Sequence, residues 1–186
     1  MADKLYFITT NEYKKEEVLK AFSVSNIELE VVSLQIRELM DLDLEVIVKD
    51  KLLQAYKKFG LPCAVEHGAI HIEALNRLPG GISKVVWDCV GDKICKFIQP
   101  GEPRNAIAKS LVGYCDGKKL HFFPGETKGL IADEARGDRK FQWDPIFIPD
   151  GSSSTYAELG FPEKETFSQA NKAWKGLITF LNTEGP

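Results

Sequence analysis

The spacing of apolar residues predicts strands and helices that alternate along the first third of the chain. Residues 4–9 form a run rich in aromatic and β-branched side chains, which is typical of a buried strand. Residues 27–34 alternate between apolar and acidic side chains, as a half-exposed strand does. Between them, Asn11 is suited to cap a helix predicted over residues 12–22. A second helix follows, and its apolar residues share one face: Leu44, Ile47, Val48, Leu52, Ala55 and Phe59.

The middle of the chain combines a short apolar run with polar residues and glycine. Residues 62–65 indicate a strand that leaves the core, and we expect two extended segments joined at Glu66-His67-Gly68. A second turn, at residues 78–81, closes this unit. Residues 82–104 are then predicted to be mainly helical.

The last part of the chain is predicted to form antiparallel strands and a final helix. Asp116-Gly117 is a strong hairpin signal between strands at residues 106–115 and 120–123, and a further strand is predicted over residues 126–132. The final helix buries Trp174, Leu177, Ile178 and Leu181. Strands that first alternate with helices and later pair as hairpins indicate an α/β fold with a mixed sheet.

Composition narrows the class of protein. The 186 residues carry a net charge of −3 with both signs spread along the chain, which argues against a nucleic-acid binder that depends on bulk positive charge. No stretch approaches the roughly 18 apolar residues of a membrane span, and the N-terminus lacks a signal-peptide pattern. The four cysteines form no CxxC pair, so reduced thiols are expected. We therefore expect one domain over residues 1–186, in the cytoplasm, without nucleic-acid or membrane partners.

A phosphate-binding site is predicted where the first strand meets the first helix. The helix start offers free backbone N–H groups and partial positive charge, and Lys14 adds a full charge beside Thr9 and Asn11. The pattern differs from the glycine-rich P-loop. The alternative is an ordinary capped helix with a solvated lysine. Exposure to solvent is likewise the default expectation for Lys51 and Glu38.

Glu66 and His67 form a candidate acid–base pair, because a carboxylate and an imidazole follow each other at the expected end of a strand. His67 and His71 are four residues apart and share a face if the segment is extended. Two histidines without a third ligand make a poor zinc site.

Residues 136–145 are a candidate base-binding segment. They combine a basic cluster with two aromatic residues, Phe141 and Trp143, and with Asp144 before a proline. Aromatic rings at this spacing are suited to hold a flat base while nearby cations meet phosphate. The alternative is an ordinary loop anchored by its aromatic side chains.

Four separated segments resemble the motifs of one enzyme family. Residues 9–14 resemble T-G-N-x-x-K, and Val65-Glu66 with the later Leu-Pro-Gly turn resembles V-E-D…L-P-G. Residues 136–145 resemble R-G…F-G-W/Y-D-P, and residues 155–168 resemble T-F/Y-A-E-L/M…K…S. The order and spacing of the segments extend over nearly the whole chain. The sequence is therefore similar to the inosine triphosphate pyrophosphatase (Ham1-like) family.

The resemblance implies a fold, a reaction and a set of site residues. Members of that family are homodimers with an elongated mixed β-sheet flanked by helices, and two lobes enclose a central cleft. They require Mg²⁺ and hydrolyse deaminated purine triphosphates, such as inosine and xanthosine triphosphate, to the monophosphate and pyrophosphate. By position, the resemblance gives catalytic roles to Glu66, His67 and Lys14, and Mg²⁺ ligation to Glu38 and Glu66. The substrate-binding residues that it implies are Thr9, Asn11, Lys14 and Lys51 for the phosphates, Phe141 and Trp143 around the base, Asp144 and Lys164 at the base or sugar, and Ser168 and Gln169.

Three departures from the family motifs affect the chemistry. His67 stands where the family has the second acid of V-E-D, Gln169-Ala170 stands where it has His-Arg, and Gln142 replaces a glycine. Mg²⁺ prefers oxygen ligands, so an imidazole replaces a carboxylate poorly as its ligand, although His67 is suited to act as a general base. Loss of the arginine removes a donor to a purine 6-oxo group. Two hypotheses follow: a nucleoside triphosphate pyrophosphatase with altered base preference, or a nucleotide-binding relative with weak or no catalysis.

Overall fold

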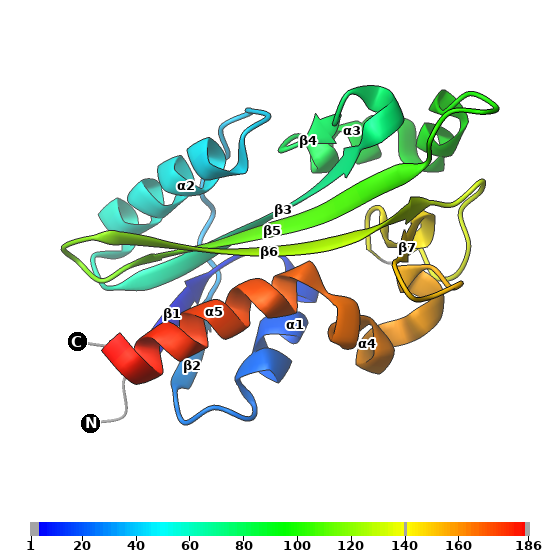
Figure 1. Ribbon diagram of the computed structural model, residues 1–186. Helices are drawn as coiled ribbons and strands as arrows, with labels where there is room; N and C mark the ends of the chain where they lie inside the picture. The colour runs from blue at the N-terminus through cyan, green and yellow to red at the C-terminus, as the bar shows by residue number, and fades with distance from the viewer. Residues whose placement is uncertain (1–3, 140, 185–186) are drawn as a thin grey trace.

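One seven-stranded mixed sheet organises the protein, and the computed structural model describes it for residues 4–139 and 141–184 (Figure 1). The strand order is β2-β1-β3-β5-β6-β7, with β4 beside β3. β1 pairs in parallel with both of its neighbours, and the pairs from β3 onwards are antiparallel. The predicted α/β class with a mixed sheet is confirmed. The strands are β1 (Lys4–Ile8), β2 (Glu28–Val32), β3 (Cys63–Ile72), β4 (Pro79–Gly80), β5 (Asn105–Cys115), β6 (Leu120–Ile131) and β7 (Phe147–Pro149).

Helices cover both faces of this sheet. α2 packs on β3 and β5, whereas α5 packs on β5 and β6 from the other face, with α1 beside it (Figure 1). No helix within the described ranges is long and apolar enough to cross a membrane. The α-helices are α1 (Glu12–Phe22), α2 (Leu44–Phe59), α3 (Ser83–Val90), α4 (Tyr156–Phe167) and α5 (Gln169–Glu184), and the 3₁₀ helices are η1 (Glu73–Leu75), η2 (Gly91–Phe97) and η3 (Asp144–Ile146).

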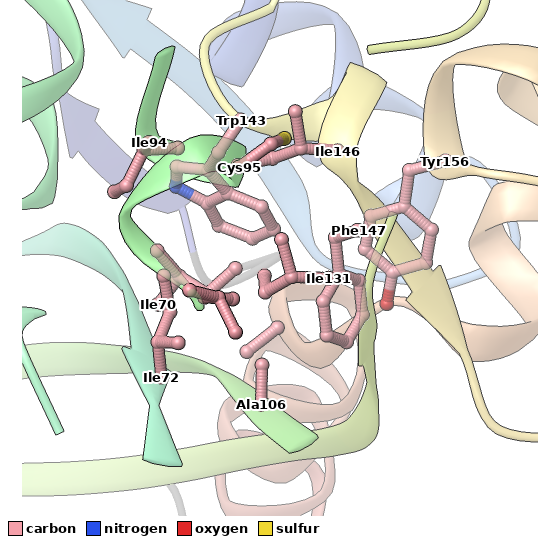
Figure 2. Packing of buried hydrophobic residues seen from close by; sticks show 12 residues of the cluster. Ile70, Ile72, Ile94, Cys95, Ala106, Ile131, Trp143, Ile146, Phe147 and Tyr156 are labelled. Carbon is pink, nitrogen blue, oxygen red and sulfur yellow. The ribbon is translucent and has the colours of Figure 1, made fainter. Parts of the chain in front are cut away.

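Buried apolar side chains form three clusters that follow from this arrangement. One lies between α2 and the sheet, and a second joins α1 and α5 to the other face, where the rings of Phe7 and Trp174 meet edge to face at 4.8 Å. The third lies at the other end of the sheet, where Trp143, Phe147 and Tyr156 pack together with several isoleucines (Figure 2). This third cluster fixes η3, β7 and α4 against the long strands, and so positions the segment that was predicted to bind a base.

β3 passes through Glu66-His67-Gly68 without a break, so the predicted join between two extended segments is wrong. Each of these three residues pairs with β5: Glu66 with Val112, His67 with Leu111 and Gly68 with Ser110. The antiparallel partner offers hydrogen bonds along the whole segment, which favours a straight strand over a glycine turn. Successive side chains on a strand point to opposite faces. Glu66 therefore faces α1 and α5, and His67 faces the side covered by α2.

β6 is also a single strand where two were predicted. It continues through Gly125 to Ile131 and pairs with β5 over its whole length. A Cβ atom built on Gly125 would lie 1.9 Å from the carbonyl oxygen of Gln169. The glycine is therefore required by the close approach of α5 and not by a turn.

Candidate active site

A cleft of about 270 Å³ opens beside the middle of β3, where the N-terminus of α1 approaches the connection after β2. It brings together ten of the residues predicted from the sequence. Three others, Asp144, Lys164 and Ser168, are buried and do not line the cleft. The predicted residues that line it are Thr9, Asn11, Lys14, Glu38, Lys51, Glu66, His67, Phe141, Trp143 and Gln169.

The N-terminus of α1 forms one side of the cleft. Asn11 has extended backbone angles, and its Oδ1 accepts hydrogen bonds from the backbone N–H groups of Tyr13, at 3.0 Å, and Lys14, at 3.2 Å. The Thr9 hydroxyl in turn accepts from the Asn11 N–H at 3.1 Å. These local bonds fix the start of the helix and direct its partial positive charge into the cleft.

Lys14 and Glu66 form a buried ion pair on the floor of the cleft. Lys14 Nζ lies 2.6 Å from Glu66 Oε2, and the Ser110 hydroxyl donates to Glu66 Oε1 at 2.6 Å. Burial raises the pKa of Glu66, but Lys14 and Ser110 outweigh this effect and hold the pKa below its usual value. Burial lowers the pKa of Lys14, but the nearby carboxylates, above all Glu66, raise it by more, so that it lies above its usual value. Both groups are therefore charged at neutral pH.

Lys51 reaches the same point from α2, and its predicted exposure to solvent is wrong. Its side chain is only 11% exposed, and its Nζ lies 2.6 Å from Glu38 Oε1 and 3.3 Å from the backbone oxygen of Glu66. Burial and the neighbouring charge of Lys14 lower the pKa of Lys51, while Lys51 keeps the pKa of Glu38 low against the effect of burial. The cleft thus presents two ammonium groups and a helix N-terminus to an anionic ligand.

His67 enters the cleft from the opposite face of β3. Its Nε2 lies 2.8 Å from the carbonyl oxygen of Gly81, and its Nδ1 lies 3.9 Å from Glu38 Oε1. Nδ1 is buried and has no hydrogen-bond partner within the described chain. Burial lowers the pKa of His67, and the charge of Lys14 lowers it further, so the imidazole is neutral at pH 7.

A second buried charge cluster lies beneath the predicted base-binding segment. Lys164 Nζ lies 2.6 Å from Asp144 Oδ2 and 3.1 Å from Glu17 Oε1. Burial lowers the pKa of Lys164, but the two carboxylates raise it by more, so the pKa lies above its usual value. Asp144 Oδ1 is buried without a hydrogen-bond partner in the part of the chain that is described. Asp144 and Lys164 therefore bind each other, and Asp144 keeps one acceptor unused.

The two predicted aromatic residues of this segment lie in different surroundings. Phe141 stacks on Tyr13 with ring centroids 4.3 Å apart, and Lys164 Nζ lies 4.8 Å from the Phe141 ring. Trp143 is only 2% exposed and packs in the third apolar cluster (Figure 2). Gln142 between them has a φ of 24°, a conformation that favours the glycine of the family motif.

The start of α5 closes the cleft opposite α1. Gln169 and Ala170 are buried and line the cleft, and Gln169 Oε1 accepts a hydrogen bond from the Tyr156 hydroxyl at 3.1 Å. The Ser168 hydroxyl accepts from the Asn171 N–H at 3.2 Å and caps this helix. Ser168 is thus used by the fold, whereas Gln169 is held with its amide at the cleft.

Three residues of this site were not predicted from the sequence. Glu17 lies one helical turn after Tyr13 and Lys14, a spacing that places it on their face of α1. Ser110 faces Glu66 only through the β3–β5 register, and Gly81 contacts His67 through its backbone. The spacing signal was present for Glu17, but no sequence pattern indicates the other two.

The pH dependence of stability gives a test of the buried position of Asp144. Burial raises the pKa of Asp144 to about 6, because the opposing effect of Lys164 is smaller and Glu17 adds repulsion. A carboxyl with a raised pKa in the folded state binds its proton more tightly there than in the unfolded state. Its contribution to the free energy of unfolding is therefore full below about pH 4 and is lost as the pH rises through 6. We expect the free energy of unfolding to depend on pH differently in wild type and in Asp144→Asn. The value for wild type, taken relative to that of the variant, should fall by up to roughly 3 kcal/mol between pH 4 and 7. Urea unfolding at a series of pH values measures it, and a flat or rising difference would contradict this position.

Known proteins are similar to this chain over nearly its whole length, in sequence and in structure. The sequence model of the Ham1 family matches residues 5–180. The dITP/XTP pyrophosphatase of Methanopyrus kandleri is 41% identical over 172 residues, which cover 91% of this chain and 92% of that protein. The inosine triphosphate pyrophosphatase of Candida glabrata is 35% identical over 187 residues, covering 96% of this chain and 97% of that protein. A solved HAM1 protein from Coxiella burnetii has a TM-score of 0.81 at 24% identity, over 97% of this chain and 98% of its own, and so shares the fold.

Proposed function

This chain belongs to the Ham1 family, and we propose on that basis that it hydrolyses nucleoside triphosphates with non-standard purine bases to the nucleoside monophosphate and pyrophosphate. The observation that carries this proposal is the meeting of Lys14 and Lys51 at Glu66, beside the N-terminus of α1. The alternative of a silent nucleotide-binding relative is not favoured, because relatives that match over nearly their whole length are named as pyrophosphatases.

The phosphate end of the cleft supports binding of a triphosphate tail. The N-terminal N–H groups of α1 and the ammonium groups of Lys14 and Lys51 are suited to bind phosphate oxygens together. A bound phosphate competes with Glu66 for Lys14. When Lys14 turns to the phosphate, the pKa of Glu66 rises, and we expect the Glu66 carboxylate to accept the proton of the attacking water.

A divalent cation is the cofactor that we expect at this end. Both oxygens of Glu66 are engaged, by Lys14 and Ser110, whereas Glu38 binds Lys51 through Oε1 and its side chain is 41% exposed at the cleft. Mg²⁺ is commonly held by one or two carboxylates together with substrate phosphates. We therefore propose Glu38 as its carboxylate ligand. Within the described ranges no three His, Cys, Asp or Glu side chains are placed to hold a metal ion, so triphosphate oxygens would have to supply further ligands. The cation neutralises charge on the triphosphate when it is bound.

The other end of the cleft supports binding of a base. The exposed part of Phe141 offers a ring to stack on, whereas Asp144 is buried and does not line the cleft. The Gln169 amide at the cleft is suited to donate to a carbonyl of the base, because its oxygen is already bound by Tyr156. A hydrogen-bond donor at this position favours bases that carry a carbonyl group, as hypoxanthine and xanthine do.

Introducing an arginine at Ala170 should sharpen the preference for 6-oxo purines. A charged hydrogen bond to the base is worth about 1.5–3 kcal/mol, so the ratio of kcat/KM for inosine triphosphate over ATP should rise about 10-fold to 150-fold in Ala170→Arg. Thr179→Arg adds the same charge to an exposed position of α5 and should leave the ratio unchanged. An unchanged ratio in Ala170→Arg would place the base elsewhere.

The homodimer is a proposal drawn from the family resemblance, whereas the location and the partners are proposals drawn from the charge and the apolar pattern of the sequence. We propose a homodimer in the cytoplasm, with a small nucleotide as its partner and without nucleic-acid or membrane partners. Light scattering during size-exclusion chromatography tests the dimer, and a single peak at the monomer mass of 20.8 kDa would contradict it.

A panel of nucleotides tests the proposed reaction. Pyrophosphate release should be fastest with inosine, deoxyinosine and xanthosine triphosphates and slower with ATP, GTP, CTP and UTP. A protein that turns over no member of the panel, with Mg²⁺ or with Mn²⁺, would refute the proposed function.

A further inference from the structure

The two nitrogen atoms of His67 have different roles that the structure fixes. Nε2 lies 2.8 Å from the carbonyl oxygen of Gly81, and a carbonyl oxygen can only accept. Nε2 therefore carries the hydrogen atom, and Nδ1 carries the lone pair. A histidine that binds a metal ion almost always donates its other N–H in this way, to a backbone carbonyl or a carboxylate.

The lone pair of Nδ1 is buried and unused. His67 is only 7% exposed and lines the cleft, and its Nδ1 has no hydrogen-bond partner among the residues described. A buried polar atom without a partner is costly, so its presence at a ligand-binding cleft requires an explanation. Glu38 Oε1, which accepts a hydrogen bond from Lys51, lies 3.9 Å from Nδ1.

The distance between these two atoms is short enough for both to bind one metal ion. Nitrogen and oxygen ligands lie about 2.1 Å from a divalent transition-metal ion, so two such ligands are about 3.0 Å apart at a right angle and about 4.2 Å apart at 180°. The 3.9 Å between His67 Nδ1 and Glu38 Oε1 falls within this range, and a bound ion would take the place of Lys51 at the exposed Glu38 side chain. Lys14 and Lys51 lie beside the same point, where the triphosphate oxygens are expected.

We propose that His67 Nδ1 and Glu38 are the two protein ligands of the divalent cation, and that the imidazole shifts the preference of this site from Mg²⁺ to a first-row transition-metal ion. This inference rests on the proposed function, because nucleotide phosphates and water supply the remaining ligands. Mg²⁺ accepts oxygen ligands almost exclusively, whereas Co²⁺, Ni²⁺ and Zn²⁺ bind imidazole and carboxylate together. A carboxylate at position 67 would remove this preference.

Binding of Co²⁺ and Mg²⁺ to the protein saturated with an α,β-methylene analogue of inosine triphosphate tests the proposal without turnover. Isothermal titration calorimetry should give a ratio of Co²⁺ to Mg²⁺ affinity at least about tenfold higher for wild type than for His67→Asp. The visible absorption spectrum of bound Co²⁺ should also differ between the two proteins, because one nitrogen ligand is lost.

Two further variants serve as controls for this test. His71→Gln changes another histidine of β3, which does not line the cleft, and should keep the wild-type ratio and spectrum. His67→Gln removes the imidazole with a side chain of similar length, and should lower the ratio even if His67→Asp folds poorly. If wild type and both His67 variants have the same ratio of Co²⁺ to Mg²⁺ affinity and the same Co²⁺ spectrum, the inference is overturned. This holds even if the enzyme is active. An enzyme without turnover whose Co²⁺ spectrum responds to His67 would instead refute the proposed reaction and keep the metal site.

Discussion

Replacing Lys14 by methionine is expected to lower the rate of triphosphate hydrolysis by about 100-fold to 1000-fold, because the cleft loses one of its two buried ammonium groups. Lys14 Nζ is held 2.6 Å from Glu66 at the point where the phosphates are expected, so no other side chain can replace its charge there without moving. Steady-state pyrophosphate release with inosine triphosphate measures the effect.

Two control proteins separate this effect from a loss of folding. Lys15→Met removes the adjacent charge, whose side chain is 44% exposed and pairs only loosely with Glu12 at 3.4 Å, and should keep near-normal activity. The double variant Lys14→Met, Glu66→Gln removes both buried charges and should be more stable than Lys14→Met alone, yet remain inactive. Equal activity of Lys14→Met and Lys15→Met would exclude Lys14 from phosphate binding.

Replacing Lys164 by methionine is expected to lower the free energy of unfolding by about 3–5 kcal/mol at pH 7, because two buried carboxylates lose their shared partner. The side chains of Lys164 and Asp144 are only 4% and 3% exposed, so water cannot replace the lost ion pair. Urea unfolding followed by circular dichroism measures the change.

A matched variant shows how much of this loss is due to burial. Lys84 and Asp88 form an ion pair across one turn of α3, but both side chains are more than half exposed. Lys84→Met should therefore cost at most about 0.5 kcal/mol. A similar loss in both lysine variants would mean that the Lys164 cluster is solvated and not buried as described.

The helix start that borders the cleft could be predicted because it depends on neighbours in the sequence. Thr9, Asn11 and Lys14 lie within six residues, and helix capping is a local property of such a segment. The course of β3 could not be predicted, because Gly68 indicates a turn until the pairing partner Ser110 is known. The burial of Lys51 likewise depends on Glu38 and on the backbone of Glu66, which the sheet brings to it.

The candidate base-binding segment was predicted only as a set of residues and not in its geometry. The motif around Phe141 and Trp143 indicated aromatic side chains near a base, but Trp143 mainly holds the third apolar cluster together. Asp144, Lys164 and Glu17 come from three separate segments, and only their tertiary packing makes them one charge cluster. Local motifs therefore identified the residues, while long-range contacts decided their partners.

The products formed from inosine triphosphate test the central claim most directly. Wild-type protein incubated with inosine triphosphate and a divalent cation should give inosine monophosphate and pyrophosphate in equal amounts, as followed by phosphorus-31 nuclear magnetic resonance. Formation of inosine diphosphate and inorganic phosphate, or of no product while the nucleotide binds, would contradict the account of this cleft as the site of a nucleoside triphosphate pyrophosphatase.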